Sequence, residues 1–199
     1  MTDESPGDSV TAHFRRSCES LNRAASDAVS LKSVVEISRT IAHCFRSGGK
    51  LLIAGNGGSA ADAQHIAGEF LSRMRFDRHP LSAIALSTDT SVLTAISNDY
   101  GFEKSFERQL RGLGRPGDIF LAISTSGYSP NILAALEAAR ELGIGTIGFT
   151  GNRDAPMGTL CDQRFIAPTD ETPLIQQIYM VAAHAICELV ERDLFDSSR

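Results

Sequence analysis

The sequence is poor in cysteine, in basic charge and in long apolar runs. Its four cysteines are scattered and form no C-x-x-C pair, so a zinc ribbon or a disulfide scaffold is not expected, and the thiols should be reduced and mostly buried. No uninterrupted run reaches the roughly 18 apolar residues that span a bilayer, and the acidic, polar N-terminus is unlike a secretory signal. These absences predict a cytoplasmic protein with no membrane partner.

The charge balance and the missing motifs argue against further classes of protein, such as nucleic-acid binders and NTPases. A net charge of −5 gives no basic footprint for a nucleic-acid partner. The G-K-[ST] signature of a phosphate-binding NTPase loop is absent, as are repeats and low-complexity tracts. What remains is a globular composition, 42% apolar and 22% charged, in a chain of 199 residues that suits one domain with a full core.

Short apolar runs alternate with helical patterns along the chain. Buried strands are expected at 51–54, 81–86, 119–123, 144–150 and 161–166. Helices are expected in two pieces between 8 and 48, then after 60, at 91–96, through 106–110, at 130–142 and at 172–195. Residues 98–101 are expected to form a polar break between helices. Strands that alternate with helices predict an α/β fold, a three-layer sandwich around a five-stranded parallel sheet, preceded by N-terminal helices.

The stretch from Lys50 to Arg73 organises the rest of the chain. An apolar strand at 51–54 runs into a glycine turn at 55–59, and apolar residues then recur at helical spacing. A strand, a glycine turn and a helix present backbone N–H groups to an anion. The turn also fits a dinucleotide fingerprint, but the acidic residue expected at the end of the second strand is missing, so we expect no nucleotide cofactor.

A second polar loop, at 124–129, follows the third predicted strand and leads into a helix. It offers several hydroxyls and backbone N–H groups but no cation, which suits a phosphate monoester held by neutral donors and a helix dipole. Loops of this composition can also do no more than cap helices. Two of them after buried strands favour binding, because open α/β sheets bind ligands at the carboxyl ends of their strands.

Four polar side chains stand out on two helices. His65 and Glu69 lie four residues apart on one helix face, and Gln176 and His184 lie eight residues apart in the apolar pattern of the last helix. Such residues are often solvated pairs or satisfied core residues. If Glu69 and His184 converge on a sugar phosphate, the carboxylate can remove a proton next to a carbonyl and the imidazole can move one at the neighbouring oxygen, or the two can trade roles. Together the four N and O side chains suit zinc or a related divalent ion.

The chain resembles the sugar-isomerase (SIS) domain proteins, and within them the phosphoheptose isomerase family, in four segments: AGNGGSAADAQHIAGEF, TDTSVLTAISNDYGFE, AISTSGYSPNIL and TPLIQQIYMVAAH. G-N-G-G-S followed by H-x-x-x-E, S-T-S-G-x-S, and Q-x7-H in the last helix form a set far more specific than any one member. The resemblance covers nearly the whole chain. It implies a single SIS domain over 1–199, with an N-terminal helical extension at 1–48 and a sugar-phosphate-binding core at 50–195.

The resemblance implies an isomerase that converts sedoheptulose 7-phosphate to D-glycero-D-manno-heptose 7-phosphate by Glu/His proton transfer through an enediolate. It also implies zinc assistance with one ion per subunit, and a cytoplasmic homotetramer with active sites between subunits. Matching motifs make Glu69 and His184 the proton-transfer pair. The metal ligands would be His65, Glu69, Gln176 and His184. The substrate contacts would be Asn56, Gly57, Gly58, Glu69, Asn98, Asp99 and Gln176, with the phosphate held by Ser124, Thr125, Ser126 and Ser129.

The chain departs from the family pattern without losing a proposed ligand. Tyr128 stands where Asn is common, and the usual Q-E-x-H at the start of the last helix carries Gln177 and Tyr179. A second hypothesis is a non-catalytic SIS-domain protein that binds a sugar phosphate or a protein partner such as a replication initiator. The presence of both Glu69 and His184 favours the enzyme, because a chain without catalysis has no need to keep both.

Overall fold

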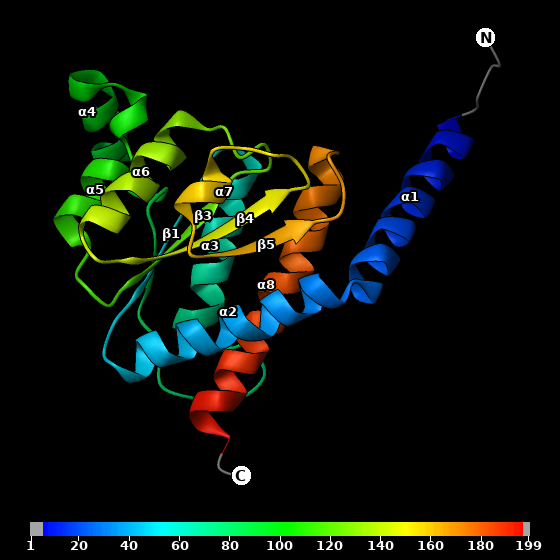
Figure 1. Cartoon of the computed structure of the whole chain (residues 1–199), viewed down its shortest axis with the longest axis horizontal. Helices are drawn as coiled ribbons and strands as arrows, with labels where there is room; N and C mark the ends of the chain where they lie inside the picture. Colours follow the sequence, from blue (N-terminus) through cyan, green and yellow to red (C-terminus); the bar gives the residue numbers. More distant parts are fainter. Residues whose placement is uncertain (1–5, 197–199) are drawn as a thin grey trace.

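A five-stranded parallel sheet forms the centre of the structure, a computed structural model that describes residues 6–196 (Figure 1). The strands are β1 (Leu51–Gly55), β2 (Ala83–Ala85), β3 (Ile119–Ile123), β4 (Gly145–Gly151) and β5 (Gln163–Ala167), in the order β2-β1-β3-β4-β5. Every residue of β1 and β3 is buried, because helices cover both faces of the sheet; such strands are continuous apolar runs. The predicted α/β fold and five-stranded parallel sheet are confirmed.

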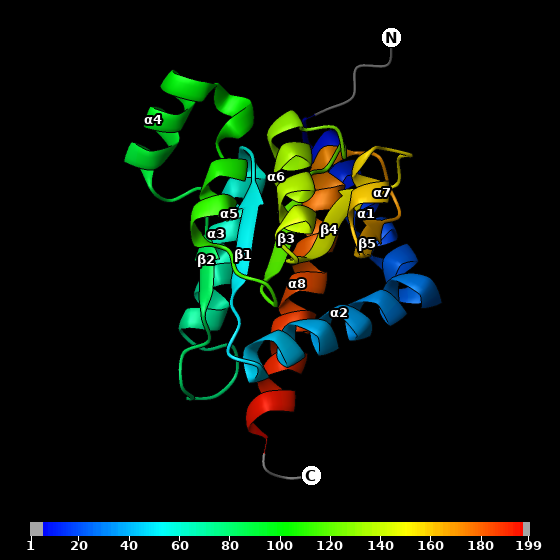
Figure 2. The ribbon, with the colours of Figure 1, turned by 60° about the vertical axis from the view of Figure 1, so that its left-hand side comes forward.

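Helices form a layer on each face of the sheet (Figure 2). One layer contains α2 (Ala28–Arg46), α3 (Gly58–Leu71) and α8 (Thr172–Phe195), and the other contains α5 (Glu107–Leu113), α6 (Pro130–Glu141) and the short α7 (Met157–Leu160). Successive residues of β1 face opposite layers, with Leu51 and Ile53 in the first core and Leu52 and Ala54 in the second. The core is therefore divided in two by the sheet.

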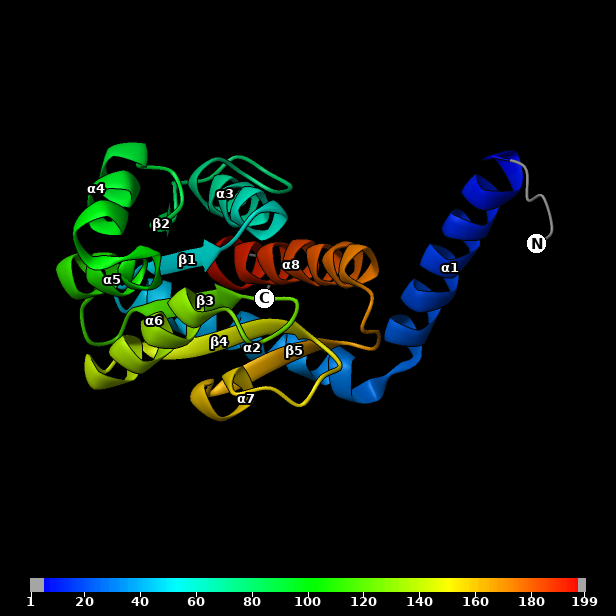
Figure 3. The same cartoon turned by 90° about the horizontal axis from the view of Figure 1, so that it is seen from above.

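Two helices project from this body. α1 (Pro6–Ser26) extends away from the sheet (Figure 3) and, among the described residues, buries only Ser20. α4 (Thr90–Tyr100) leaves all its residues at least partly exposed, and the one-turn helix η1 (Phe102–Lys104) follows it. Both helices show surface that the single chain does not cover.

Several element boundaries differ from the sequence prediction. β2 covers half of the predicted 81–86 because it is an edge strand paired on one side, and Ile84 is 37% exposed there. Residues 98–100 form the last turn of α4 and do not break it, so that prediction is wrong. The break comes at Gly101, whose φ of 88° lies in the left-handed region where glycine ends a helix without strain. β5 begins later than predicted, after the unpredicted α7.

α8 is a helix of the protein core, although its length and composition alone would let it cross a membrane. Half of its most apolar window is buried, and the helix packs against α2, α3, β4 and β5. Its apolar residues thus pack into the core on the side of the sheet that α2, α3 and α8 cover.

The four cysteines are free thiols, as expected. Cys44 and Cys187 are buried, Cys161 is partly buried and Cys18 is exposed. Burial raises the pKa of Cys44 to about 11 and the pKa values of Cys161 and Cys187 to about 12, so these three are protonated at neutral pH. They are poor nucleophiles and poor metal ligands in that state.

Candidate active site

The two polar loops meet where the strand order of the sheet reverses. β1 and β3 are neighbours in the sheet. The strand that follows β1 in the chain, β2, lies on one side of this pair, and the strand that follows β3, β4, lies on the other side. The crevice between β1 and β3 is therefore a switch point. Asn56, directly after β1, exchanges two amide hydrogen bonds of 2.8 and 2.9 Å with Asn131 of α6. The glycine turn and the loop at 124–129 therefore share one edge of the sheet.

The loop at 124–129 is held in a tight turn by its own hydroxyls. Ser124 Oγ lies 3.0 Å from Ser129 Oγ and accepts a 3.1 Å hydrogen bond from the Gly127 N–H, and Ser126 Oγ accepts one of 3.2 Å from the Tyr128 N–H. Gly127 has a φ of 72°, and a Cβ there would lie 2.6 Å from the Ala155 Cβ, so only glycine fits. Ser124 is buried, whereas Thr125, Ser126 and Ser129 stay partly exposed before the N-terminus of α6. The turn can offer hydroxyl and N–H donors to an anion.

The glycine turn makes room for the last helix. Gly57 precedes α3 with a φ of 57°, and a Cβ on Gly58 would lie 2.7 Å from Gln176 Nε2. Gln176, near the start of α8, is thereby placed directly against the predicted substrate-binding turn.

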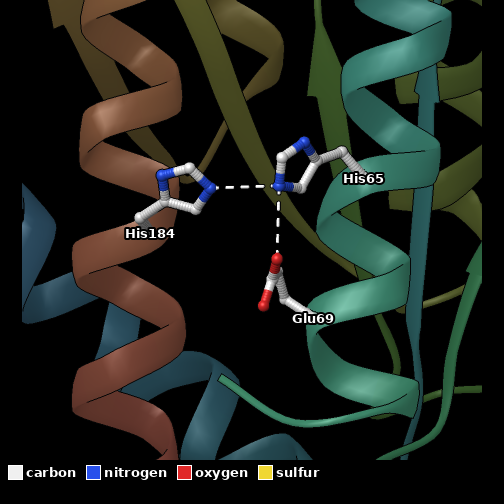
Figure 4. A group of neighbouring side chains, drawn as sticks. All are labelled: His65, Glu69 and His184. Atoms are coloured by element: carbon white, nitrogen blue, oxygen red, sulfur yellow. Dashed lines mark hydrogen bonds and ion pairs between the residues drawn. The ribbon is translucent and has the colours of Figure 1, made fainter. Parts of the chain in front are cut away.

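His65 and Glu69 of α3 face His184 of α8 (Figure 4). His65 Nε2 lies 3.2 Å from Glu69 Oε1 and 3.1 Å from His184 Nε2, and one ligand atom from each of the three residues lies within 4.8 Å of the others. The side chains of His65 and Glu69 are 49% and 23% exposed, so the group is open to a ligand. Residues 119 positions apart in sequence are thus brought onto one point of the surface.

The chemistry of this group fits a divalent metal ion. Two imidazole nitrogens and one carboxylate oxygen are the donors that zinc takes in catalytic sites, which keep a further position for water or substrate. The structure places the fourth predicted ligand, Gln176, two turns earlier on α8, beside Gly58.

Asn98 and Asp99 lie apart from the other predicted site residues. They lie exposed at the end of α4, which projects from the body of the structure (Figure 2), and Asn98 Nδ2 donates a 2.8 Å hydrogen bond to Asp99 Oδ1. Within the described part of the chain, they bond to each other and not to the other predicted site residues.

Tyr179, which the sequence showed only as a departure from the family pattern, ties α8 to α3. Its fully buried hydroxyl donates to Asp62 Oδ2 and lies 2.9 Å from Ser59 Oγ. Burial, and next the hydrogen bond to Asp62, raise the pKa of Tyr179 above its usual range, so the hydroxyl stays protonated. The available signal was a tyrosine in the apolar pattern of a core helix, since a buried phenol needs a hydrogen-bond partner.

Sequence reasoning missed Arg78, which supports the turn that carries Glu69. Its Nη2 donates a 2.9 Å hydrogen bond to the backbone carbonyl of Glu69, and its Nη1 donates one of 2.8 Å to that of Phe70. Its Nε lies 3.0 Å from Glu191 Oε1 of α8, and both side chains of this ion pair are almost fully buried. Arg78 therefore donates to two carbonyls in the last turn of α3 while joining that helix to α8.

Comparison with known proteins gives one consistent result. The SIS domain family matches residues 13–151. A phosphoheptose isomerase of a Bradyrhizobium species is 56% identical over 187 residues, which cover 94% of each chain. The structure is similar to the phosphoheptose isomerases of Neisseria gonorrhoeae, with a TM-score of 0.87 and 39% identity, and of Francisella tularensis, with a TM-score of 0.90 and 31% identity. Both similarities cover 94% of this chain and 99% of the other.

Proposed function

Since the chain belongs to the phosphoheptose isomerase family of SIS-domain proteins, we propose that it converts sedoheptulose 7-phosphate to D-glycero-D-manno-heptose 7-phosphate. The observation that carries the proposal is the convergence of Glu69 of α3 and His184 of α8 (Figure 4). A carboxylate beside an imidazole is the pair that moves protons between adjacent carbon and oxygen atoms.

The proposed reaction needs two proton exchanges that balance. Glu69 takes the proton from C1 of the ketose while His184 gives one to the carbonyl oxygen on C2, which leaves an enediol between C1 and C2. Glu69 then returns its proton to C2, and His184 takes the proton from the oxygen on C1. The carbonyl has moved to C1, both residues have regained their starting states, and the product is the aldose phosphate.

The loop at 124–129 is proposed to hold the phosphate, with Ser124, Thr125, Ser126 and Ser129 as donors at the start of α6. Asn56, Gly57, Gly58 and Gln176 at the neighbouring turn, with Asn98 and Asp99 of α4, are proposed to contact the sugar. A charged sugar phosphate is costly to move into an apolar medium, so substrate and enzyme are expected in the cytoplasm.

One zinc ion per subunit is proposed at His65, Glu69, Gln176 and His184. Zinc would polarise the substrate carbonyl and stabilise the negative charge that develops on its oxygen. Ligation lowers the basicity of a carboxylate, so Glu69 serves both purposes only if it alternates between metal binding and proton transfer.

Incubation with a panel of ketose phosphates, followed by product analysis, tests this function. Sedoheptulose 7-phosphate is expected to give the aldose phosphate at the highest rate, because the chain belongs to the phosphoheptose isomerase family. Chelator should abolish turnover and added zinc should restore it. Binding of the sugar phosphate without turnover would support the non-catalytic hypothesis instead, and turnover that survives chelator would contradict the zinc proposal.

A homotetramer is proposed from the uncovered helices. Val10 and Phe14 of α1 are 57% and 69% exposed, and an apolar groove between α1, α2 and α8 is lined by residues such as Leu31 and Val181. We expect Phe14→Ser to reduce the mass in solution, measured by light scattering, whereas the neighbouring Arg16→Ser should not. A wild-type monomer at micromolar concentration would contradict the proposal.

A further inference from the structure

Tyr128 joins the loop at 124–129 to the segment between β4 and α7. Its side chain is largely exposed, and its hydroxyl donates a 2.7 Å hydrogen bond to the backbone carbonyl of Asp154. Tyr128 is one of the departures from the family pattern, in which Asn is common at this position. Because the Asn side chain is much shorter, the contact depends on the residue that departs from the pattern.

The segment that accepts this hydrogen bond is itself held in place. The N–H of Asn152 donates a 3.0 Å hydrogen bond to the carbonyl of Thr169, and Arg153 Nη2 donates one of 3.0 Å to the carbonyl of Asp170. These two acceptors lie just before α8, which begins at Thr172. The phenol therefore binds to a segment that other contacts already fix to the body of the protein.

Few other hydrogen bonds cross between the loop and this segment. The carbonyl of Thr125 accepts a 3.2 Å hydrogen bond from the Gly151 N–H, and the carbonyl of Gly127 accepts one of 3.4 Å from the Met157 N–H. Across the described residues, the phenol of Tyr128 makes the one side-chain hydrogen bond between the loop and residues 152–157, and it is shorter than both backbone bonds. Its removal would leave the second half of the loop with one long hydrogen bond to that segment.

The backbone of Tyr128 also orients the hydroxyl of Ser126. The Tyr128 N–H donates a 3.2 Å hydrogen bond to Ser126 Oγ. A serine hydroxyl has one donor and two acceptor positions, so this bond fills an acceptor position and leaves the hydroxyl proton for an anion. Ser126 is partly exposed, and an anion at the start of α6 can reach it. The residue that the phenol fixes is thus the residue that directs Ser126.

We propose that Tyr128 is a positioning residue, whose phenol fixes the loop at 124–129 to the carbonyl of residue 154 and so holds the Ser126 hydroxyl in place for the substrate phosphate. This inference rests on the proposed function, because it takes the loop to bind the phosphate. A loop that is ordered before binding loses less conformational entropy when the ligand arrives. The contact therefore strengthens phosphate binding and takes no part in proton transfer.

Tyr128→Phe tests the proposal, since it keeps the exposed ring and removes only the hydroxyl. We expect the dissociation constant of inorganic phosphate, measured by titration calorimetry, to rise about 3- to 10-fold, as the loss of one hydrogen bond predicts. KM for sedoheptulose 7-phosphate should rise by a similar factor, while kcat and the melting temperature should change far less. Tyr100→Phe alters another exposed tyrosine, on α4, and is the matched control, with unchanged phosphate affinity expected.

A double-mutant cycle with Ser126→Ala shows whether the phenol acts through Ser126. Ser126→Ala should itself weaken phosphate binding, and adding Tyr128→Phe should then cost much less than it does in the wild type. Unchanged phosphate affinity in Tyr128→Phe, or an equal loss in the Ser126→Ala background, would overturn the inference while leaving the proposed phosphate site intact. A fall in kcat at unchanged KM would overturn it as well. If Ser126→Ala binds phosphate as tightly as the wild type, the proposed phosphate site fails, and the inference fails with it.

Discussion

Glu69→Gln is expected to abolish turnover of sedoheptulose 7-phosphate while leaving the sugar phosphate measurably bound. The amide has the shape of the carboxylate but cannot accept the C1 proton, and positioned acid–base groups contribute on the order of 10²–10⁴-fold to rate. The loop at 124–129, which is proposed to hold the phosphate, is untouched by the change. We therefore expect kcat to fall by about 10³-fold or more, with little change in the dissociation constant of the phosphosugar.

The metal role of Glu69 needs its own control. His65→Ala removes a proposed ligand that takes no part in proton transfer, and excess zinc should return part of its activity. Glu69→Gln should stay inactive in excess zinc, because its missing function is the base. Wild-type activity in Glu69→Gln would exclude the proton-transfer assignment. Equal rescue of both variants by zinc would limit Glu69 to metal binding.

The parts of the fold that sequence predicted well depend on local pattern. The run at 119–123 matches β3 at both ends, because a strand covered on both faces is a continuous apolar run. The loop at 124–129 was predicted at the end of that strand because small polar residues separate it from a helix with Pro130 in its first turn. The edge strand β2 and the end of α4 were predicted poorly, since neither is set by a strong burial pattern.

The site itself depends on contacts that no local pattern contains. Helical spacing pairs His65 with Glu69, but on its own it favours a core role for His184 over a catalytic one. Only the packing of α3 on α8 brings Nε2 of His65 to 3.1 Å from Nε2 of His184. Tyr179 and Asp62 meet across 117 residues, and Arg78 and Glu191 across 113. The sequence resemblance named the proposed ligands, whereas the contacts of Tyr179 and Arg78 that join their two helices came only from the structure.

Arg78→Met is expected to be strongly destabilising, although the residue lies in a loop. It would leave Glu191 buried without its cation, and breaking a buried ion pair on one side typically costs about 3–5 kcal/mol. The backbone carbonyl of Glu69 would also lose the Arg78 donor, and that of Phe70 would keep only the Leu81 N–H. Urea unfolding should report this loss, and the surviving folded protein should have reduced kcat, because the turn that carries Glu69 is no longer held.

Two further variants show whether the unpaired buried charge of Glu191 causes the loss of stability in Arg78→Met. Arg75→Met breaks an ion pair with Glu188 in which the arginine side chain is 61% exposed, and such pairs are worth about 0–1 kcal/mol. The double variant Arg78→Met with Glu191→Leu removes both charges and should be more stable than Arg78→Met alone. It will not regain full stability, because the N–H groups of Met74 and Arg75 lose Glu191 as their acceptor. If Arg78→Met and Arg75→Met were equally stable, the Arg78–Glu191 pair would not hold α3 to α8, and the support proposed here for Glu69 would have to come from elsewhere in the helix interface.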